Sequence, residues 1–336
     1  MGCMLAAPAS RRVAGGPMQQ QQQQQQHLLN GWLQQQLGLE LERLQPVGGG
    51  CIHQAWQLQL RGGGQLFAKT NRSALLPVLQ AEAEGLVALR EAAQRARQRQ
   101  GEPTLQIPEP LALGHLGGAG EDNDQAVLVL SWLELGTAGQ EPDRGWRALG
   151  IGLARLHRAS LEGHDGRYGW GLDNAIGASP QANGWSPSWC TFFGERRLGA
   201  QWHRAQASGQ RLAGAAELLA QLPRWLGEHQ PDACLVHGDL WGGNAGLLAG
   251  GGGAIFDPAV HRADREVDLA MARLFGGFPG AFFAGYEQEW PLPRGHRQRI
   301  ALYNLYHLLN HANLFGGGYW SQCERSIAAL LKQGPG

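Results

Sequence analysis

The chain has 336 residues, enough for two domains or for one large two-lobed domain. Apolar residues make up 43% of it, and the formal net charge of zero argues against nucleic-acid or membrane partners bound through bulk charge. Its five cysteines are odd in number and lack paired spacing, which favours free thiols in a reducing cytoplasm over a disulfide framework. We therefore expect a cytoplasmic protein with no nucleic-acid and no membrane partner.

The N-terminal region divides into a tail, a helix and a β-rich segment. Residues 1–26 end in a run of glutamines and are predicted to be a disordered tail. From His27, the sequence HLLNGWLQQQLG predicts a short amphipathic helix. Alternating apolar and polar residues and intervening turns then predict three strands, over Leu39–Pro46, Ile52–Leu60 and Gln65–Thr70.

A glycine-rich turn and a lysine are placed as in a nucleotide-binding hairpin. Gly48, Gly49 and Gly50 follow the first predicted strand, and Lys69 lies on the third. Glycines let backbone N–H groups approach phosphates closely, and kinases place a lysine on a strand soon after such a hairpin. With 51 glycines in the chain, an ordinary turn is the alternative.

The next predicted element is a long helix, Ser73–Arg99. Glu82 lies on its mainly apolar face together with Leu79 and Leu86. An unpaired carboxylate there would be costly, so we expect a partner for it, and Lys69 is the natural one. The alternative is a charge at the rim of the helix.

Two further strands, Ile107–Leu116 and Ala126–Leu133, are predicted to form a hairpin. The second contains Ser131, Trp132 and Leu133 at its end, where a two-lobed kinase has the hinge whose backbone binds adenine. We therefore predict an N-terminal nucleotide-clamping lobe over residues 27–134.

Residues 135–333 are predicted to form a mainly helical catalytic and substrate lobe. The expected helices are Trp146–Ala159, Glu195–Gln206, Ala213–His229, one running to about Phe275, and Arg297–Phe315. Tyr168–Phe193 shows little periodicity and combines tryptophans with amides. It predicts either a sugar-binding loop or a loop that covers the core.

The stretch 235–258 contains the residues that phosphoryl transfer needs. Apolar runs at Cys234–Val236 and Ala254–Phe256 predict two strands, each followed by an acid, Asp239 and Asp257. Asn244 follows Asp239 by five residues. Phosphoryl transfer requires a carboxylate near the accepting hydroxyl and oxygen ligands for Mg²⁺, so we assign Asp239 as the base and Asn244 and Asp257 as metal ligands.

The chain resembles the fructosamine kinase (ketosamine-3-kinase) family from residue 28 to about 330. The resemblance rests on these stretches: DNAIGASPQ at 173–181, LVHGDLWGGN at 235–244, FDPAVHRADREVDLAMARLFGGFP at 256–279 and LYNLYHLLNHANLFGGGY at 302–319. It implies an α+β, two-lobed protein-kinase-like fold, with a small antiparallel N-lobe containing one long helix and a larger mainly helical C-lobe.

The resemblance also implies ATP- and Mg²⁺-dependent phosphorylation of the sugar O3 of ketoamines, whose products break down and free the amine, so that proteins are deglycated. Trp241, between base and metal ligand, is expected to offer a ring to the sugar, and His311 to border the substrate. Where protein kinases have Asp-Phe-Gly, this chain has Asp257-Pro258-Ala259, which predicts a stiff metal-binding loop.

The expected substrates are small ketoamines or glycated lysines of proteins. Another small-molecule kinase, of the aminoglycoside or choline type, and a non-catalytic pseudokinase that binds ketoamines are the alternatives. The chain is expected to be a monomer, or a dimer linked through Cys51 in the glycine-rich turn.

Overall fold

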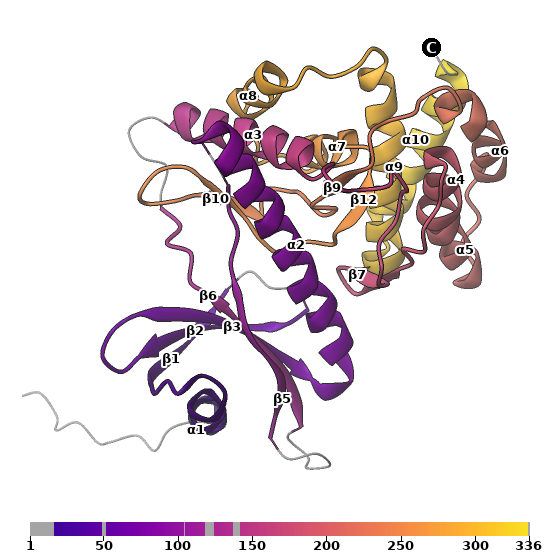
Figure 1. The fold of residues 1–336 in the computed structure, drawn as a ribbon. Coiled ribbons are helices and arrows are strands. Elements are labelled where there is room, and N and C mark those ends of the chain that lie inside the picture. Colours follow the sequence, from indigo (N-terminus) through magenta and orange to yellow (C-terminus); the bar gives the residue numbers. More distant parts are fainter. Residues whose placement is uncertain (1–16, 49–51, 104, 118–123, 137–141, 335–336) are drawn as a thin grey trace, which may run out of the picture.

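The computed structural model describes residues 17–48, 52–103, 105–117, 124–136 and 142–334. They form a small lobe built on a five-stranded sheet and a larger, mainly helical lobe (Figure 1). The α+β architecture expected from the sequence is confirmed. None of the helices in the described ranges is long and apolar enough to cross a membrane.

The small lobe contains one antiparallel sheet. Its strands, in spatial order, are β1 (Leu41–Val47), β2 (Gln54–Leu60), β3 (Gln65–Arg72), β6 (Gln125–Ser131) and β5 (Pro110–Leu116). Strand side chains alternate between faces, so Val127 and Val129 of β6 join one apolar cluster while Leu128 and Leu130 join another. Lys69 pairs with Leu128 in register and therefore shares its face.

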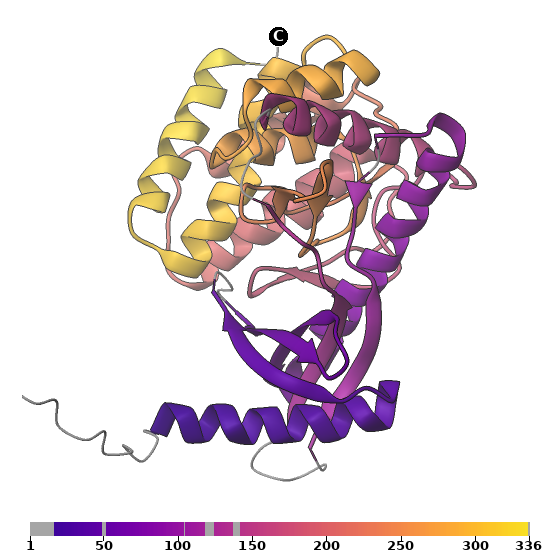
Figure 2. The ribbon, with the colours of Figure 1, turned by 90° about the vertical axis from the view of Figure 1, so that its left-hand side faces the viewer.

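Helix α1 (Pro17–Leu37) covers the other face of the sheet and corrects one prediction (Figure 2). Residues 17–26, predicted to belong to a disordered tail, are helical. Glutamine favours helix, and these side chains also reach the sheet: Gln22 and Gln26 donate to the carbonyls of Leu44 and Glu42 at 2.8 and 3.2 Å. Residues 1–16 lie outside the described ranges.

Helix α2 (Leu76–Gln100) packs on the Lys69 face of the sheet and extends along the helical lobe (Figure 1). A short 3₁₀ turn, η1 (Ser73–Leu75), precedes it, and Pro77 lies in its first turn. Its buried residues Leu79, Leu86 and Leu89 belong to an apolar cluster that continues into the larger lobe. The helix thus joins sheet and lobe in one core.

The larger lobe combines helices with short strand pairs. Its helices are α3 (Pro142–Ala159), α4 (Trp189–Phe193), the π-helical η2 (Gly194–Gly199), α5 (Ala200–Ala207), α6 (Ala215–Leu226), α7 (Glu266–Leu274), α8 (Gly280–Glu289), α9 (His296–Phe315) and α10 (Gly318–Gln333). Its strand pairs are β7 (Asn174–Ile176) with β8 (Ser179–Gln181), β9 (Cys234–Val236) with β12 (His261–Ala263), and β10 (Ala245–Leu247) with β11 (Gly253–Ile255), beside which β4 (Leu105–Gln106) runs parallel.

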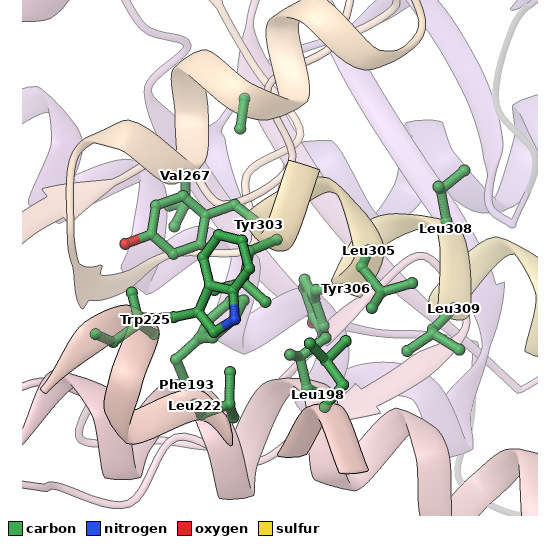
Figure 3. Packing of buried hydrophobic residues seen from close by; sticks show 14 of the residues in the cluster. Phe193, Leu198, Leu222, Trp225, Val267, Tyr303, Leu305, Tyr306, Leu308 and Leu309 are labelled. Atoms are coloured by element: carbon green, nitrogen blue, oxygen red, sulfur yellow. The ribbon is translucent and has the colours of Figure 1, made fainter. Parts of the chain in front are cut away.

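The helix predicted over Arg297–Phe315 is present as α9, and its apolar stripe lies at the centre of this lobe. Leu302, Leu305, Tyr306 and Leu309 of α9 are all buried in one apolar cluster. Figure 3 shows Tyr306 and Leu305 of this stripe close to residues of α4, η2 and α6. Trp189, from the aromatic-rich segment 168–193, is also buried here and donates to the Tyr303 hydroxyl at 2.9 Å. Part of that segment therefore covers the core.

Candidate active site

The site is built around Lys69, whose ammonium lies between two carboxylates. Its Nζ is 2.7 Å from Oε1 of Glu82 on α2 and 2.6 Å from Oδ1 of Asp257 in the larger lobe. The partnership of Lys69 with Glu82 predicted from the sequence is present. Burial alone would lower the pKa of Lys69, but the two carboxylates raise it above its ordinary value, so the ammonium stays charged.

Asp257 is held in an unusual backbone conformation. Its φ is +58°, and no other non-glycine residue in the described ranges has a positive φ. Such conformations are costly and are typically found at functional sites, where the surrounding structure enforces them. The side chain of Asp257 is 43% exposed although one of its oxygens is paired with Lys69.

Asp239 lies in a loop fixed by buried hydrogen bonds. The loop follows β9, and Gly238 within it has a φ of +80°; a Cβ there would lie 2.1 Å from the carbonyl oxygen of Ala259. The carboxylate of Asp268 on α7 accepts from the backbone N–H groups of His237 and Gly238 at 2.7 and 2.8 Å. Asp268 thus braces the loop.

His237 joins this loop to Phe256, the residue between β11 and Asp257. Its Nε2 lies 2.9 Å from the carbonyl of Phe256, and its Nδ1 accepts from the backbone N–H of Asp239 at 3.3 Å. One nitrogen donates and the other accepts, which is the pattern of a neutral imidazole. Burial, the largest effect, lowers the pKa of His237 and so agrees with this assignment.

Asn244 brings the two acids together. Its Nδ2 donates to Oδ2 of Asp239 at 3.2 Å and to the carbonyl of Asp257 at 3.4 Å. Burial raises the pKa of Asp239 to about 7, and the Asp257 carboxylate contributes to the rise. The three residues predicted to act together therefore lie in contact.

The charges at this site suit a divalent cation. Glu82, Asp239 and Asp257 offer three carboxylates, against one ammonium from Lys69. Burial is the larger cause of the raised pKa of Asp239, and the nearby Asp257 carboxylate adds to it. Carboxylate and amide oxygens are the ligands that Mg²⁺ prefers, so the side chains of Asn244 and Asp257 fit it.

Only some of the other residues predicted to bind the nucleotide lie within the described ranges. Gly48 follows β1 and is exposed, whereas Gly49, Gly50 and Cys51 lie outside the described residues. At the junction of the lobes, the Trp132 ring lies 6.5 Å from that of Phe67. The Ser131 hydroxyl accepts from the Glu109 N–H at 2.8 Å, and the Leu133 carbonyl accepts from Leu135 N–H at 2.9 Å.

The predicted substrate residues come from the Asp239 loop and from α9. Trp241 is 38% exposed, and its ring covers Gly243 so closely that a Cβ there would lie 2.3 Å from it. His311 lies on α9, half-buried, with its ring centroid 4.5 Å from that of Phe275, the residue that follows α7.

The hairpin β7–β8 holds the Asp257 loop, a role that sequence reasoning missed. Gln181 donates to the Ala259 carbonyl at 3.2 Å, and Asn174 to that of Val260 at 2.8 Å. Buried Arg197 donates to Asn183 Oδ1 at 2.6 Å, and Tyr306 to Gln181 Oε1 at 2.6 Å. The stretch DNAIGASPQ was the available signal, but its partners are distant in the chain.

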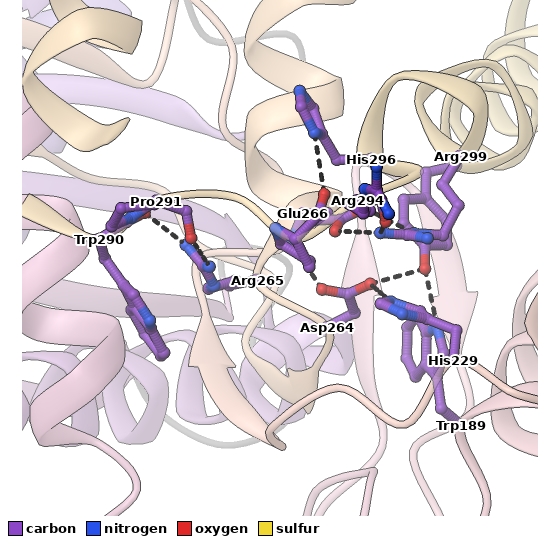
Figure 4. A network of polar contacts seen from close by, with 12 residues as sticks. Trp189, His229, Asp264, Arg265, Glu266, Trp290, Pro291, Arg294, His296 and Arg299 are labelled. Atoms are coloured by element: carbon purple, nitrogen blue, oxygen red, sulfur yellow. Dashed lines mark hydrogen bonds and ion pairs between the residues drawn. The ribbon is translucent and has the colours of Figure 1, made fainter. Parts of the chain in front are cut away.

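A second acidic cluster is part of the structural framework (Figure 4). Ligand atoms of His229, Asp264 and Glu266 lie within 4.8 Å of one another. Arg299 donates to both Glu266 oxygens at 2.6 and 2.8 Å, and Oδ2 of Asp264 lies 2.7 Å from His229 and accepts from Tyr303, also at 2.7 Å. Oδ1 of Asp264 also accepts from the backbone N–H of Glu266, the first residue of α7, at 3.0 Å.

The two-lobed fold and the meeting of Lys69, Glu82, Asp239 and Asp257 define a phosphotransferase of the protein-kinase-like class. The model of the fructosamine kinase family matches residues 21–333. The chain belongs to this family, and the family resemblance seen in the sequence is confirmed.

Two relatives and one solved structure illustrate the similarity. A protein of Synechocystis named "probable ketoamine kinase" is 41% identical over 292 residues, 87% of this chain and 91% of the relative. The chloroplastic protein-ribulosamine 3-kinase of Arabidopsis thaliana is 34% identical over 297 residues, 87% and 84% of the two chains. A crystal structure from Haemophilus somnus, provisionally named a fructosamine-3-kinase, superimposes with a TM-score of 0.76 at 23% identity and covers 90% of this chain and 96% of that one.

Proposed function

We propose that this kinase transfers the γ-phosphoryl group of ATP to the sugar O3 of ketoamines, such as fructosamines and ribulosamines, and thereby leads to protein deglycation. The observation that carries the proposal is the convergence of Asp239, Asn244 and Asp257 beside Lys69. The names of the relatives support ketoamines as the substrate class.

On the nucleotide side, the backbone of Gly48–Gly50 and the ammonium of Lys69 would bind the ATP phosphates, with Glu82 holding Lys69 in place. The backbone at Ser131–Leu133 would bind the adenine edge. Asn244 and Asp257 would hold Mg²⁺, which supplies neutralisation of the phosphate charge when it is bound.

On the acceptor side, Trp241 and His311 would border the sugar and place O3 at Asp239. The Asp239 carboxylate takes the proton from O3 as the bond from O3 to the γ-phosphorus forms and the bond from that phosphorus to the bridging oxygen breaks, so that ADP leaves. A pKa of about 7 suits this role, because a general base works best when its pKa lies near the working pH.

We also propose a cytoplasmic location for this activity. The described cysteines Cys190, Cys234 and Cys323 are free thiols, which a reducing compartment favours. A dimer joined through Cys51 stays a prediction, testable by non-reducing electrophoresis of the protein and its Cys51→Ser variant.

The function is tested by measuring ADP release with ribulosamine, erythrulosamine and fructosamine side by side. We expect turnover of at least one, with the 3-phosphate as product, and a loss of roughly 100-fold or more in kcat for Asp239→Asn. Lys69→Ala should chiefly impair ATP use. Near-normal kcat in Asp239→Asn would overturn the base assignment, and turnover of an aminoglycoside or choline in place of every ketoamine would overturn the substrate class.

A further inference from the structure

Four ring-bearing side chains gather beside the Asp239 loop. We call Phe275, His311, Phe315 and Tyr319 the aromatic patch. The His311 ring centroid lies 4.5 Å from that of Phe275, 5.3 Å from Tyr319 and 5.6 Å from Phe315. Phe315 is 61% exposed, more than any other large hydrophobic residue in the described ranges. An apolar ring left in water has a cost, which a bound partner would offset.

A reversal of the backbone between α9 and α10 brings residues of the aromatic patch together. Phe315 ends α9, and Gly316 and Gly317 follow with φ values of +64° and +58°, which reverse the chain and bring Tyr319 of α10 back against Phe315. Glycine suits both positions because side chains disfavour this conformation. The patch is therefore a defined surface and not a frayed helix end.

The patch is continuous with the catalytic loop. Gly276 and Gly277 follow Phe275, and a Cβ on Gly277 would lie 2.7 Å from the Cα of Gly242, which is the residue after Trp241. On another side, a Cβ on Gly177 of the β7–β8 turn would lie 3.3 Å from Leu314 and 3.8 Å from Ile52 of the small lobe. The end of α9 thus lies where the sugar-binding side of the site meets both lobes.

We propose that the aromatic patch binds the amine portion of the ketoamine and selects adducts of amines that carry an apolar or aromatic body. This inference rests on the proposed function. In a ketoamine the nitrogen is bonded to C1, two carbons from C3, so a sugar with O3 at Asp239 directs its amine substituent to the immediate surroundings of the loop.

The chemistry of the patch suits such a group. The secondary amine of a ketoamine is protonated near neutral pH, and aromatic faces attract cations. The Nδ1 of His311 lies 2.9 Å from the His307 carbonyl and so donates to it, which leaves Nε2 as an acceptor for an ammonium N–H. Burial lowers the pKa of His311, so the ring is neutral and does not repel the cation.

The test compares adducts of one sugar with three amines: methylamine, butylamine and benzylamine. We expect wild-type KM to fall in that order at similar kcat. Phe315→Ala and Tyr319→Ala should each raise KM for the butyl and benzyl adducts by roughly 3- to 10-fold, leave the methyl adduct within about 2-fold, and leave kcat unchanged. Val87→Ala, an equally simple truncation of an exposed residue on α2, is the control and should change nothing.

Two results would overturn the inference while the kinase assignment stands: equal wild-type KM values for the three adducts, or variants whose KM rises by the same factor for all of them. Absence of turnover with every ketoamine would instead remove the proposed function, and the inference with it. Melting temperatures of the variants check that the fold is intact.

Discussion

Asp239 is a carboxylate whose surroundings favour its protonated form. Its pKa is raised to about 7, mainly by burial and further by the charge of Asp257. The raised pKa that suits a general base therefore lowers the stability of the folded protein at neutral pH. In the unfolded chain Asp239 would titrate near its ordinary value of 3.8.

The pH dependence of stability follows from this shift. Between about pH 4 and pH 7 the folded protein holds a proton on Asp239 that the unfolded chain has lost, so the free energy of unfolding falls as pH rises through this window. Asp239→Asn removes the titration. We expect the variant, although nearly inactive, to melt at least about 2 °C above wild type at pH 8, and the gap to close at pH 4.

Thermal melting of the two proteins across pH 4–8 in the absence of nucleotide measures this effect. An Asp239→Asn variant that melts below wild type at pH 8 would contradict it. Asp232→Asn, the same change at an exposed position, is the control and should leave the melting curve unchanged.

At the scale of elements, apolar periodicity in the sequence predicted the helices and strands that depend mainly on their own residues. The strands of the small lobe and helices α2, α3 and α9 were found because each carries an apolar stripe or alternation of its own. The ion pair of Lys69 with Glu82 was also predicted, because a carboxylate on an apolar helix face requires a partner.

The helices and hydrogen bonds that were not predicted depend on contacts between segments distant in the chain. The helical glutamines of α1 are fixed by carbonyls of β1, and the β7–β8 hairpin by carbonyls beyond Asp257. Helices α8 and α10 were not predicted. Much of what holds α8 is backbone packing on α3, which leaves no periodic signal: a Cβ on Gly150 would lie 2.0 Å from the carbonyl oxygen of Phe282, and one on Gly285 2.2 Å from that of Arg147.

The close approach of α3 and α8 can be tested with two glycine-to-alanine substitutions. Gly150→Ala should force α3 and α8 apart and destabilise the protein by roughly 1–3 kcal/mol. Gly31→Ala, on α1 where no atom lies within 4 Å of the added methyl group, should instead stabilise by about 0.5–1 kcal/mol, because alanine favours helix over glycine. Urea unfolding measures both, and similar effects at the two positions would contradict the packing argument.

For the whole molecule, Lys69 and Asp257 join the lobes at the point where the nucleotide is proposed to bind. Lys69 belongs to the small lobe and Asp257 to the large one, so binding there should stabilise the assembly of both. Mg²⁺ with ADP at about 100 times its Kd should add roughly 2.7 kcal/mol, or about 5 °C in melting temperature.

Removal of the metal tests which residues hold it. With EDTA, wild type should lose most of the rise in melting temperature that ADP induces. Asp257→Asn should show only this reduced rise, whether Mg²⁺ is present or not. Asp232→Asn should respond as wild type does. A Mg²⁺-dependent shift that survives in Asp257→Asn would exclude Asp257 as a ligand.

Reducing sugars attach to free amines, and this chain offers them few. Lys69 and Lys332 are its two lysines. Enclosed between carboxylates, Lys69 has no lone pair to attack an aldehyde, whereas Lys332 is exposed near the end of α10. Incubation with ribose and peptide mass spectrometry should find adducts on Lys332 but not on Lys69, and on both lysines after unfolding in urea. Folding alone would then keep the one lysine of the proposed active site free of the damage that the proposed substrates carry.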